Sequence, residues 1–244
     1  MSTFEFLLLV SLLGMIILYT RKNKKEEKEQ VQASDVICGK ILTAEEQSAL
    51  EPDTILSILK KGNQDFVKGA VTVRNNSERM RHASLGQHPL AVVLSCLDSR
   101  VPVEDVFHQG IGDIFVLRVA GNIVNEDILG SLEYACKVSG SKLILVLGHE
   151  YCGAIRSAVD KVEMGNITSL LEKIQPAVNA SEDFVGDKTS ANPAYLTHVC
   201  AENVKVSVDN IRAKSVILNQ MEVEGTIKIV GAVYDMETGR VLFK

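Results

Sequence analysis

Four short runs of this sequence are rich in apolar, often β-branched residues and show no regular polar alternation. They cover residues 90–95, 113–118, 142–147 and 227–233. Runs of this kind are typical of strands that are covered on both faces, as in a parallel sheet. The pattern therefore predicts four strands at the centre of a folded domain.

Helical periodicity appears between these runs. In residues 125–138, Ile128, Leu132 and Ala135 recur at helical spacing, and Asn125 is suited to cap the helix. Residues 153–178 and 193–213 also have helical patterns. The succession of strand, helix and strand predicts an α/β fold with a mainly parallel central sheet flanked by helices.

The flanking segments give weaker predictions. Residues 43–46 have the form of a capping box, Pro52 suits a first helical turn, and residues 55–67 supply an apolar helical face that we expect to be interrupted at Gly62. Residues 69–88 have little periodicity and are predicted to be a long surface connection. Residues 235–239 have turn chemistry between apolar stretches, which predicts a C-terminal hairpin.

The N-terminus differs from the rest of the chain. Residues 4–20 are almost entirely apolar, and a basic cluster at residues 21–25 follows them. This order favours an N-terminal hydrophobic helix that anchors the chain in a membrane, with the following residues on the cytoplasmic side. The alternatives are an atypical signal for export, for example to the periplasm, and a helix that is buried in the protein. The predicted organisation is an anchor at 1–20, a charged tether at 21–36 and one catalytic domain at 37–244.

The composition of the chain argues against some classes of function. The formal charge of the 244-residue chain is -5, which does not favour a nucleic-acid-binding protein. Its five cysteines are scattered, so they do not indicate a disulfide framework. We expect Cys38, Cys136 and Cys200 to have no catalytic role.

Two of the apolar runs end in residues that bind soft metals. Cys96 follows the first run, and His149 and Cys152 follow the third. Ligands in parallel α/β sheets bind beyond the carboxyl ends of strands, so these side chains are expected to meet. Two thiolates and one imidazole suit Zn²⁺, and three protein ligands leave the fourth position that a catalytic zinc needs.

Asp98 and Arg100 lie beside Cys96 in the sequence. Asp98 is close enough to compete for the fourth position on zinc, and the guanidinium of Arg100 can hold a carboxylate through two parallel hydrogen bonds. We expect Arg100 to keep Asp98 off the metal in an open state, and Asp98 to bind the metal only in a closed state.

Four sequence blocks together resemble the β-class carbonic anhydrase family. They are residues 96–102 (CLDSRVP), 112–122 (GDIFVLRVAGN), 130–135 (GSLEYA) and 148–154 (GHEYCGA). The resemblance covers roughly residues 43–244. It implies the fold of that family with a four-stranded, mainly parallel sheet, one zinc ion per chain held by Cys96, His149 and Cys152, and a switchable Asp98–Arg100 pair.

The resemblance also implies substrate contacts and assembly. Gln87 matches a glutamine that hydrogen-bonds substrate in plant-like members, often across a dimer interface, and Gly153 matches a position that lines the site. The structural alternative for Gln87 is a solvated loop residue. Family members form intertwined dimers and often tetramers, so a homodimer or homotetramer is expected. The chain has no tryptophan, which argues against the inhibitory bicarbonate pocket of some bacterial members.

The predicted reaction is the reversible hydration of CO₂ to bicarbonate and a proton through a zinc-bound hydroxide, which Asp98 helps to orient. His108 and Tyr151 are candidate proton relays. Two alternatives keep the same site: a carbon disulfide hydrolase, and a zinc-stabilised bicarbonate-binding protein without turnover.

Overall fold

A five-stranded sheet forms the centre of the folded domain in the computed structural model, which describes residues 41–70 and 76–244. The strand order is β2-β1-β3-β4-β5. Its strands are β1 (Ala91–Ser95), β2 (Ile114–Arg118), β3 (Leu143–His149), β4 (Lys228–Tyr234) and β5 (Val241–Phe243). The first four are mutually parallel and β5 is antiparallel to β4. The α/β prediction is confirmed, and the resemblance omitted only the short fifth strand.

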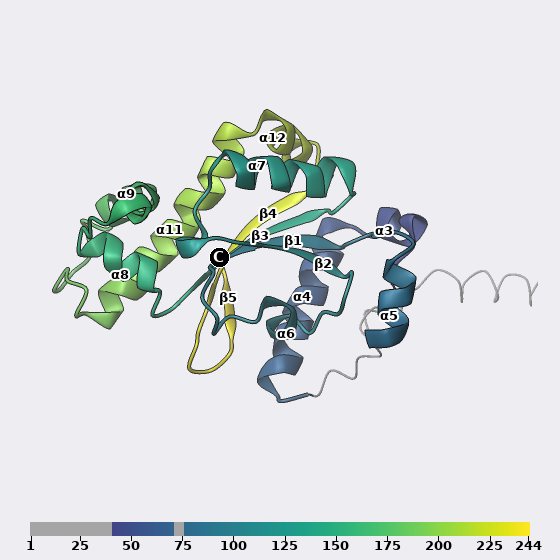
Figure 1. The fold of residues 1–244 in the computed structure, drawn as a ribbon, viewed down its shortest axis with the longest axis horizontal. Helices are drawn as coiled ribbons and strands as arrows, with labels where there is room; N and C mark the ends of the chain where they lie inside the picture. Colours follow the sequence, from purple (N-terminus) through teal and green to yellow (C-terminus); the bar gives the residue numbers. More distant parts are fainter. Residues whose placement is uncertain (1–40, 71–75) are drawn as a thin grey trace, which may run out of the picture. The chain divides into compact units, whose positions relative to one another are not determined.

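Helices cover both faces of the sheet (Figure 1). On one face lie α7 (Glu126–Glu133), α11 (Pro193–Lys214) and α12 (Val216–Val223), and α11 packs directly on β3 and β4. On the other face α4 (Pro52–Val67) contacts β3. Every residue of β1 and β3 is buried, which explains why their sequences show no polar alternation.

The remaining helices are short. They are α3 (Ala44–Ala49), α5 (Asn76–Ala83), α6 (Val103–Val106), the single turn η1 (Ala120–Asn122), the π-helical turn η2 (Tyr134–Val138), α8 (Gly153–Val159), α9 (Gly165–Leu171) and α10 (Gln175–Ala180).

The predicted helix starts are confirmed by their capping contacts. Thr43 and Glu46 form the reciprocal capping box of α3. Asn125 accepts a hydrogen bond from the backbone N–H of Ile128 at 2.9 Å and caps α7. The hairpin is also confirmed, because Asp235 accepts from the backbone N–H groups of Glu237 and Thr238 between β4 and β5.

Two predictions in the N-terminal half were wrong. Helix α4 is not interrupted at Gly62. A Cβ there would lie 1.9 Å from the carbonyl oxygen of Phe107, so the glycine permits close backbone approach. Residues 69–88 are not only a connection, since they contain α5. This helix is weakly amphipathic, and the buried ion pair between Arg79 and Asp113 attaches it to the domain.

The predicted anchor at residues 4–20 and the tether at 21–36 lie outside the described residues. Within the described part of the chain, no helix is both long enough and apolar enough to cross a membrane.

Candidate metal centre

The sheet register brings the two ligand-bearing strand ends together. Strands β1 and β3 are adjacent, with Ser95 opposite Leu147. Cys96 follows β1 directly, and His149 is the last residue of β3. After a two-residue turn the chain reaches Cys152, the residue that precedes α8. The structure therefore brings all three predicted metal ligands together at the carboxyl ends of the parallel strands.

The three side chains form a compact buried cluster. One ligand atom from each of Cys96, His149 and Cys152 lies within 4.8 Å of the others. The two sulfur atoms are 3.9 Å apart. The three residues are only 4%, 1% and 4% exposed, respectively. Such a set of two sulfurs and one nitrogen fits the ligand preference of Zn²⁺.

The orientation of His149 leaves its coordinating nitrogen available. Its Nδ1 lies 2.8 Å from the carbonyl oxygen of Glu150, which fixes the tautomer that has a proton on Nδ1. Its Nε2 is buried and has no hydrogen-bond partner in the part of the chain that the structure describes. A buried polar nitrogen without a partner destabilises the folded state, and a metal ion in the cluster would give this nitrogen a partner. The residues present therefore fit a zinc ion.

The cysteines of the chain differ in acidity. A hydrogen bond from Cys152 lowers the pKa of Cys96, whereas that bond and burial raise the pKa of Cys152. Because a metal binds cysteine as the thiolate, metal binding would release protons from this pair. Burial raises the pKa of both Cys136 and Cys200 to about 12, so these two remain thiols.

Asp98 and Arg100 are paired as the sequence suggests. The guanidinium Nε and Nη2 atoms donate to Asp98 Oδ1 and Oδ2 at 2.9 and 2.7 Å. This pairing lowers the pKa of Asp98 to about 2. Asp98 Oδ2 also lies 3.9 Å from His149 Nε2. The carboxylate therefore lies beside the cluster while it is held by Arg100.

Sequence reasoning missed two supporting groups. Arg118, at the end of β2, donates through Nε to the carbonyl oxygen of Cys96 at 3.0 Å and through Nη2 to that of Asp98. Gly121 donates its backbone N–H to Cys96 Sγ at 3.3 Å. Both lie in the block at 112–122. The sequence feature that could have indicated a role for Arg118 is its position at the end of the predicted strand at 113–118.

The turn between β4 and β5 also reaches the site. Met236 Sδ lies 3.3 Å from His149 Nδ1, and Tyr151 Oη donates to Glu237 at 2.5 Å. The bond to Glu237 raises the pKa of Tyr151. Local sequence patterns gave no indication of these contacts, because the partners are separated by more than 80 positions.

Two further predicted residues are not joined to the cluster. Gln87 is exposed, and among the described residues no hydrogen bond links it to the three ligands. A Cβ on Gly153 would meet nothing within 4 Å, so the protein itself leaves open space there. Their roles toward substrate remain predictions. The relay candidate His108 is buried after α6.

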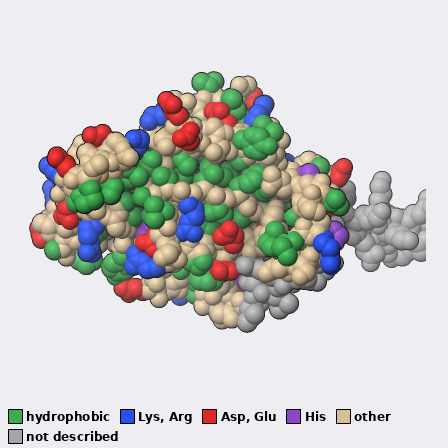
Figure 2. Space-filling model, in the orientation of Figure 1, with side chains coloured by type: hydrophobic (Ala, Val, Ile, Leu, Met, Phe, Trp, Pro, Cys, Tyr) green, Lys and Arg blue, Asp and Glu red, His purple; other side chains and the backbone are tan. Residues whose placement is uncertain are grey.

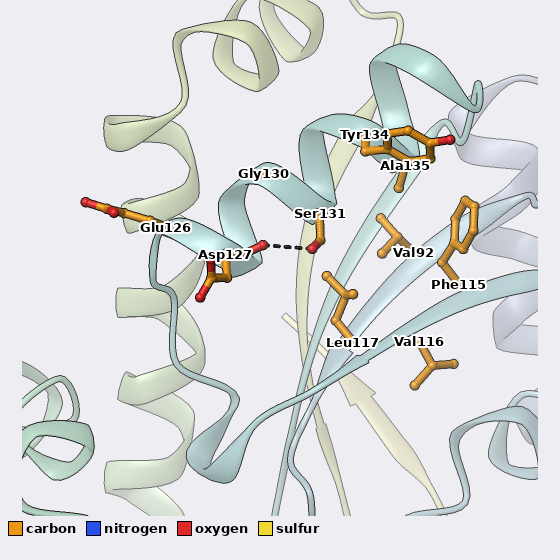
Figure 3. A pocket seen from close by; sticks show the side chains of 10 residues that line it. All are labelled: Val92, Phe115, Val116, Leu117, Glu126, Asp127, Gly130, Ser131, Tyr134 and Ala135. Carbon is orange, nitrogen blue, oxygen red and sulfur yellow. Dashed lines mark hydrogen bonds between the residues drawn. The ribbon is translucent and has the colours of Figure 1, made fainter. Parts of the chain in front are cut away.

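A separate groove of about 560 Å³ lies between β2 and α7 (Figure 3). Phe115 and Leu117 line it from the strand, and Tyr134, the first residue of η2, lines it from the turn that follows α7. Tyr134 is 55% exposed. In Figure 2, hydrophobic side chains gather in a band across this face of the domain. None of the three candidate metal ligands lines this groove.

Comparisons with known proteins agree with this geometry. The family described as "Carbonic anhydrase" matches residues 91–241. A carbonic anhydrase of Mycolicibacterium smegmatis is 35% identical over 189 residues, which cover 75% of this chain and 88% of that protein. Carbonic anhydrase 2 of Mycobacterium tuberculosis is 32% identical over 194 residues, covering 76% of this chain and 89% of that protein.

Solved structures show the same fold. The β-carbonic anhydrase CcaA has a TM-score of 0.63 at 24% identity, with 77% of this chain and 86% of that chain covered. The Coccomyxa β-carbonic anhydrase, solved with acetazolamide, has a TM-score of 0.62 at 25% identity, covering 77% and 85%. A structure from a study of two tetrameric β-carbonic anhydrases of Sordaria macrospora has a TM-score of 0.62 at 20% identity, covering 78% and 96%.

Proposed function

Because this chain belongs to the β-class carbonic anhydrase family and is therefore a carbonic anhydrase enzyme, we propose that it catalyses the zinc-dependent reversible hydration of CO₂ to bicarbonate and a proton. The observation that supports the proposal most is the buried cluster of Cys96, His149 and Cys152, in which one ligand nitrogen has no hydrogen-bond partner among residues 41–70 and 76–244.

The three side chains of the cluster would hold one zinc ion per chain. When bound, zinc supplies a Lewis acid that makes a coordinated water acidic enough to act as a nucleophile near neutral pH, as the general pKa of about 7 for zinc-bound water in carbonic anhydrases illustrates. The backbone N–H of Gly121 stabilises the thiolate of Cys96, and the carbonyl of Glu150 keeps the proton of His149 on Nδ1. Both contacts hold these ligand atoms in the protonation state that binds a metal.

Asp98 would orient the attacking oxygen. Its carboxylate is ionised, because Arg100 holds its pKa well below neutrality, so it accepts hydrogen bonds and does not donate them. While Arg100 occupies both carboxylate oxygens, Asp98 stays beside the ligand cluster as an acceptor. Gln87 and Gly153 are proposed to contact substrate, Gly153 because its position leaves room for a small molecule.

A stopped-flow assay of CO₂ hydration, with zinc quantified in the same preparation of full-length protein, tests the proposal. We expect turnover that rises in proportion to zinc content, up to one ion per chain. A parallel assay with carbon disulfide as substrate tests the alternative that the protein is a carbon disulfide hydrolase. A fully zinc-loaded protein without CO₂ turnover would contradict the proposal and would favour a binding protein.

We propose further that a second copy of the chain covers the groove between β2 and α7. Strand β2 is at the edge of the sheet, its apolar residues are only half-buried, and unpaired edge strands are suited to association. The tetrameric relatives from Sordaria macrospora support an oligomer. A homodimer or homotetramer is the proposed state.

The proposed location is the cytoplasmic side of a membrane, through the apolar segment at residues 4–20 and the basic residues that follow it. A reporter enzyme fused after Lys244 tests this topology. Activity of the reporter in the cytoplasm and sedimentation of the protein with membranes are expected. A reporter that is active only outside the cytoplasm would favour the export alternative.

A further inference from the structure

The hairpin turn at residues 235–239 supports the segment that follows β3. Glu150 donates its backbone N–H to the carbonyl oxygen of Tyr234 at 3.1 Å. The next residue, Tyr151, donates its phenol hydrogen to Glu237 at 2.5 Å. Two consecutive residues between the ligands His149 and Cys152 are thus attached to the end of β4 and to its turn.

Tyr151 has a backbone conformation that needs such support. Its φ is +54°, in the left-handed region that bulky residues rarely adopt. The side chain is 42% exposed, so packing alone does not hold it. A phenol that donates to a carboxylate forms a charge-assisted hydrogen bond, which is stronger than a neutral one. The bond to Glu237 therefore restrains the side chain of Tyr151 at its hydroxyl group.

The carbonyl group of Tyr151 makes contact with Arg100. The Nη2 atom of Arg100 donates to Asp98 Oδ2 at 2.7 Å and to the carbonyl oxygen of Tyr151 at 3.2 Å. This nitrogen has two hydrogens, so its two acceptors need not compete. The Tyr151 carbonyl therefore helps to orient the guanidinium that pairs with Asp98.

We propose that the hydrogen bond between Tyr151 and Glu237 is a positioning element that keeps Arg100 paired with Asp98 and so keeps Asp98 away from the metal. The inference rests on the proposed function. Because Asp98 Oδ2 is already 3.9 Å from His149 Nε2, a small movement brings it among the ligands. Once the bond is lost, Tyr151 can relax, Arg100 loses an acceptor, and Asp98 occupies the closed position more often.

The test compares Tyr151→Phe, Glu237→Ala and their double variant with the wild-type protein, all full-length and zinc-loaded. Substrate can use only the open fraction of molecules, so kcat/KM for CO₂ is expected to fall about three- to tenfold in each variant, with unchanged zinc content. The double variant should lose no more than either single variant, since both remove one bond. Glu237→Gln keeps an acceptor oxygen and is expected to restore most of the activity.

A second measurement does not depend on turnover. Azide binds at an open coordination position, so its affinity for the cobalt-substituted protein, followed by visible absorption, should fall by the same factor as kcat/KM. Glu163→Gln, which removes an exposed carboxylate elsewhere on the surface, is the matched control and should change neither quantity.

Wild-type values of kcat/KM and azide affinity in both Tyr151→Phe and Glu237→Ala would overturn the positioning role, while the proposed function would stand. A wild-type protein that holds zinc but does not hydrate CO₂ would instead contradict the proposed function itself. Equal losses in Glu237→Gln and Glu237→Ala, with losses in the double variant that simply add, would also contradict the positioning role.

Discussion

At the scale of single residues, the described cysteines divide into two kinds. Cys96 and Cys152 point at one another and at His149, whereas Cys136 is an isolated thiol in an apolar environment. Cys96→Ser and Cys152→Ser are each expected to lose zinc and CO₂ hydration together, because a neutral oxygen is a poor substitute for a thiolate. Metal analysis and stopped-flow kinetics on the same samples measure both losses.

Cys136→Ser is the matched control for those variants. It is expected to keep one zinc per chain and wild-type turnover, at a cost only in stability. Full zinc occupancy in both Cys96→Ser and Cys152→Ser would show that the ligand assignment is wrong.

The pair of Asp98 and Arg100 gives the second prediction at this scale. In Arg100→Ala the carboxylate loses both side-chain donors, and we expect Asp98 to bind zinc as a fourth ligand. Zinc content should stay near normal while CO₂ hydration is abolished. Arg100→Lys should be intermediate, since an ammonium lacks the planar fork of a guanidinium. Asp98→Ala should keep zinc but orient the nucleophile poorly.

Zinc content, zinc-edge X-ray absorption and turnover of Arg100→Ala and Asp98→Ala together decide this prediction. Near wild-type turnover in Arg100→Ala would show that the switch is wrong, although the zinc site itself could stand.

At the scale of elements, close backbone approach decides how α4 packs. Ala at position 62 would place a Cβ 1.9 Å from the carbonyl oxygen of Phe107, and backbone atoms there cannot easily move. Gly62→Ala is therefore expected to lower the free energy of unfolding by about 3 kcal/mol, despite the better helix propensity of alanine. Urea denaturation measures the change. Ser57→Ala, at an exposed position on the same helix, should change it by less than about 0.5 kcal/mol.

The ion pair of Arg212 and Glu222 joins α11 to α12 and gives a prediction on pH. Burial raises the pKa of Glu222, but the bonds from Arg212 outweigh it, and the net pKa is lowered below its ordinary value of 4.5. The unfolded chain therefore binds a proton more readily than the folded one. The stabilisation is fully present above about pH 4.5 and is lost as the pH falls through the folded pKa.

Urea midpoints measured between about pH 3 and 7 on wild type and Glu222→Gln check this. The stability difference between the two proteins should shrink toward low pH. Loss of metal at low pH lowers the stability of both proteins equally if they carry equal zinc, so it does not change this difference. Glu224→Gln is the control, because its carboxylate lies on the neighbouring surface and contacts Gln220 instead. A difference between wild type and Glu222→Gln that does not vary with pH would contradict the prediction.

At the scale of the whole molecule, the groove between β2 and α7 predicts assembly. Light scattering of the wild-type protein at micromolar concentration should show a dimer or tetramer. Tyr134→Lys puts a charge on the exposed rim of the groove and is expected to weaken the dimer at least tenfold. Val185→Lys, at an exposed apolar position elsewhere, should leave the assembly unchanged. A wild-type protein that is only monomeric would count strongly against the proposed interface.

The sequence by itself determined the parallel strands, the helix starts at Thr43 and Asn125, and the identity of the three candidate ligands. These features follow from local patterns: burial on both faces removes alternation, capping needs particular side chains, and thiolates with imidazole select zinc. Only the tertiary structure decided that Arg118 and Gly121 support Cys96, that Gly62 faces a carbonyl group, and that Glu237 reaches Tyr151. Those contacts depend on which strands are neighbours and how a distant turn packs, and no local periodicity encodes such distances.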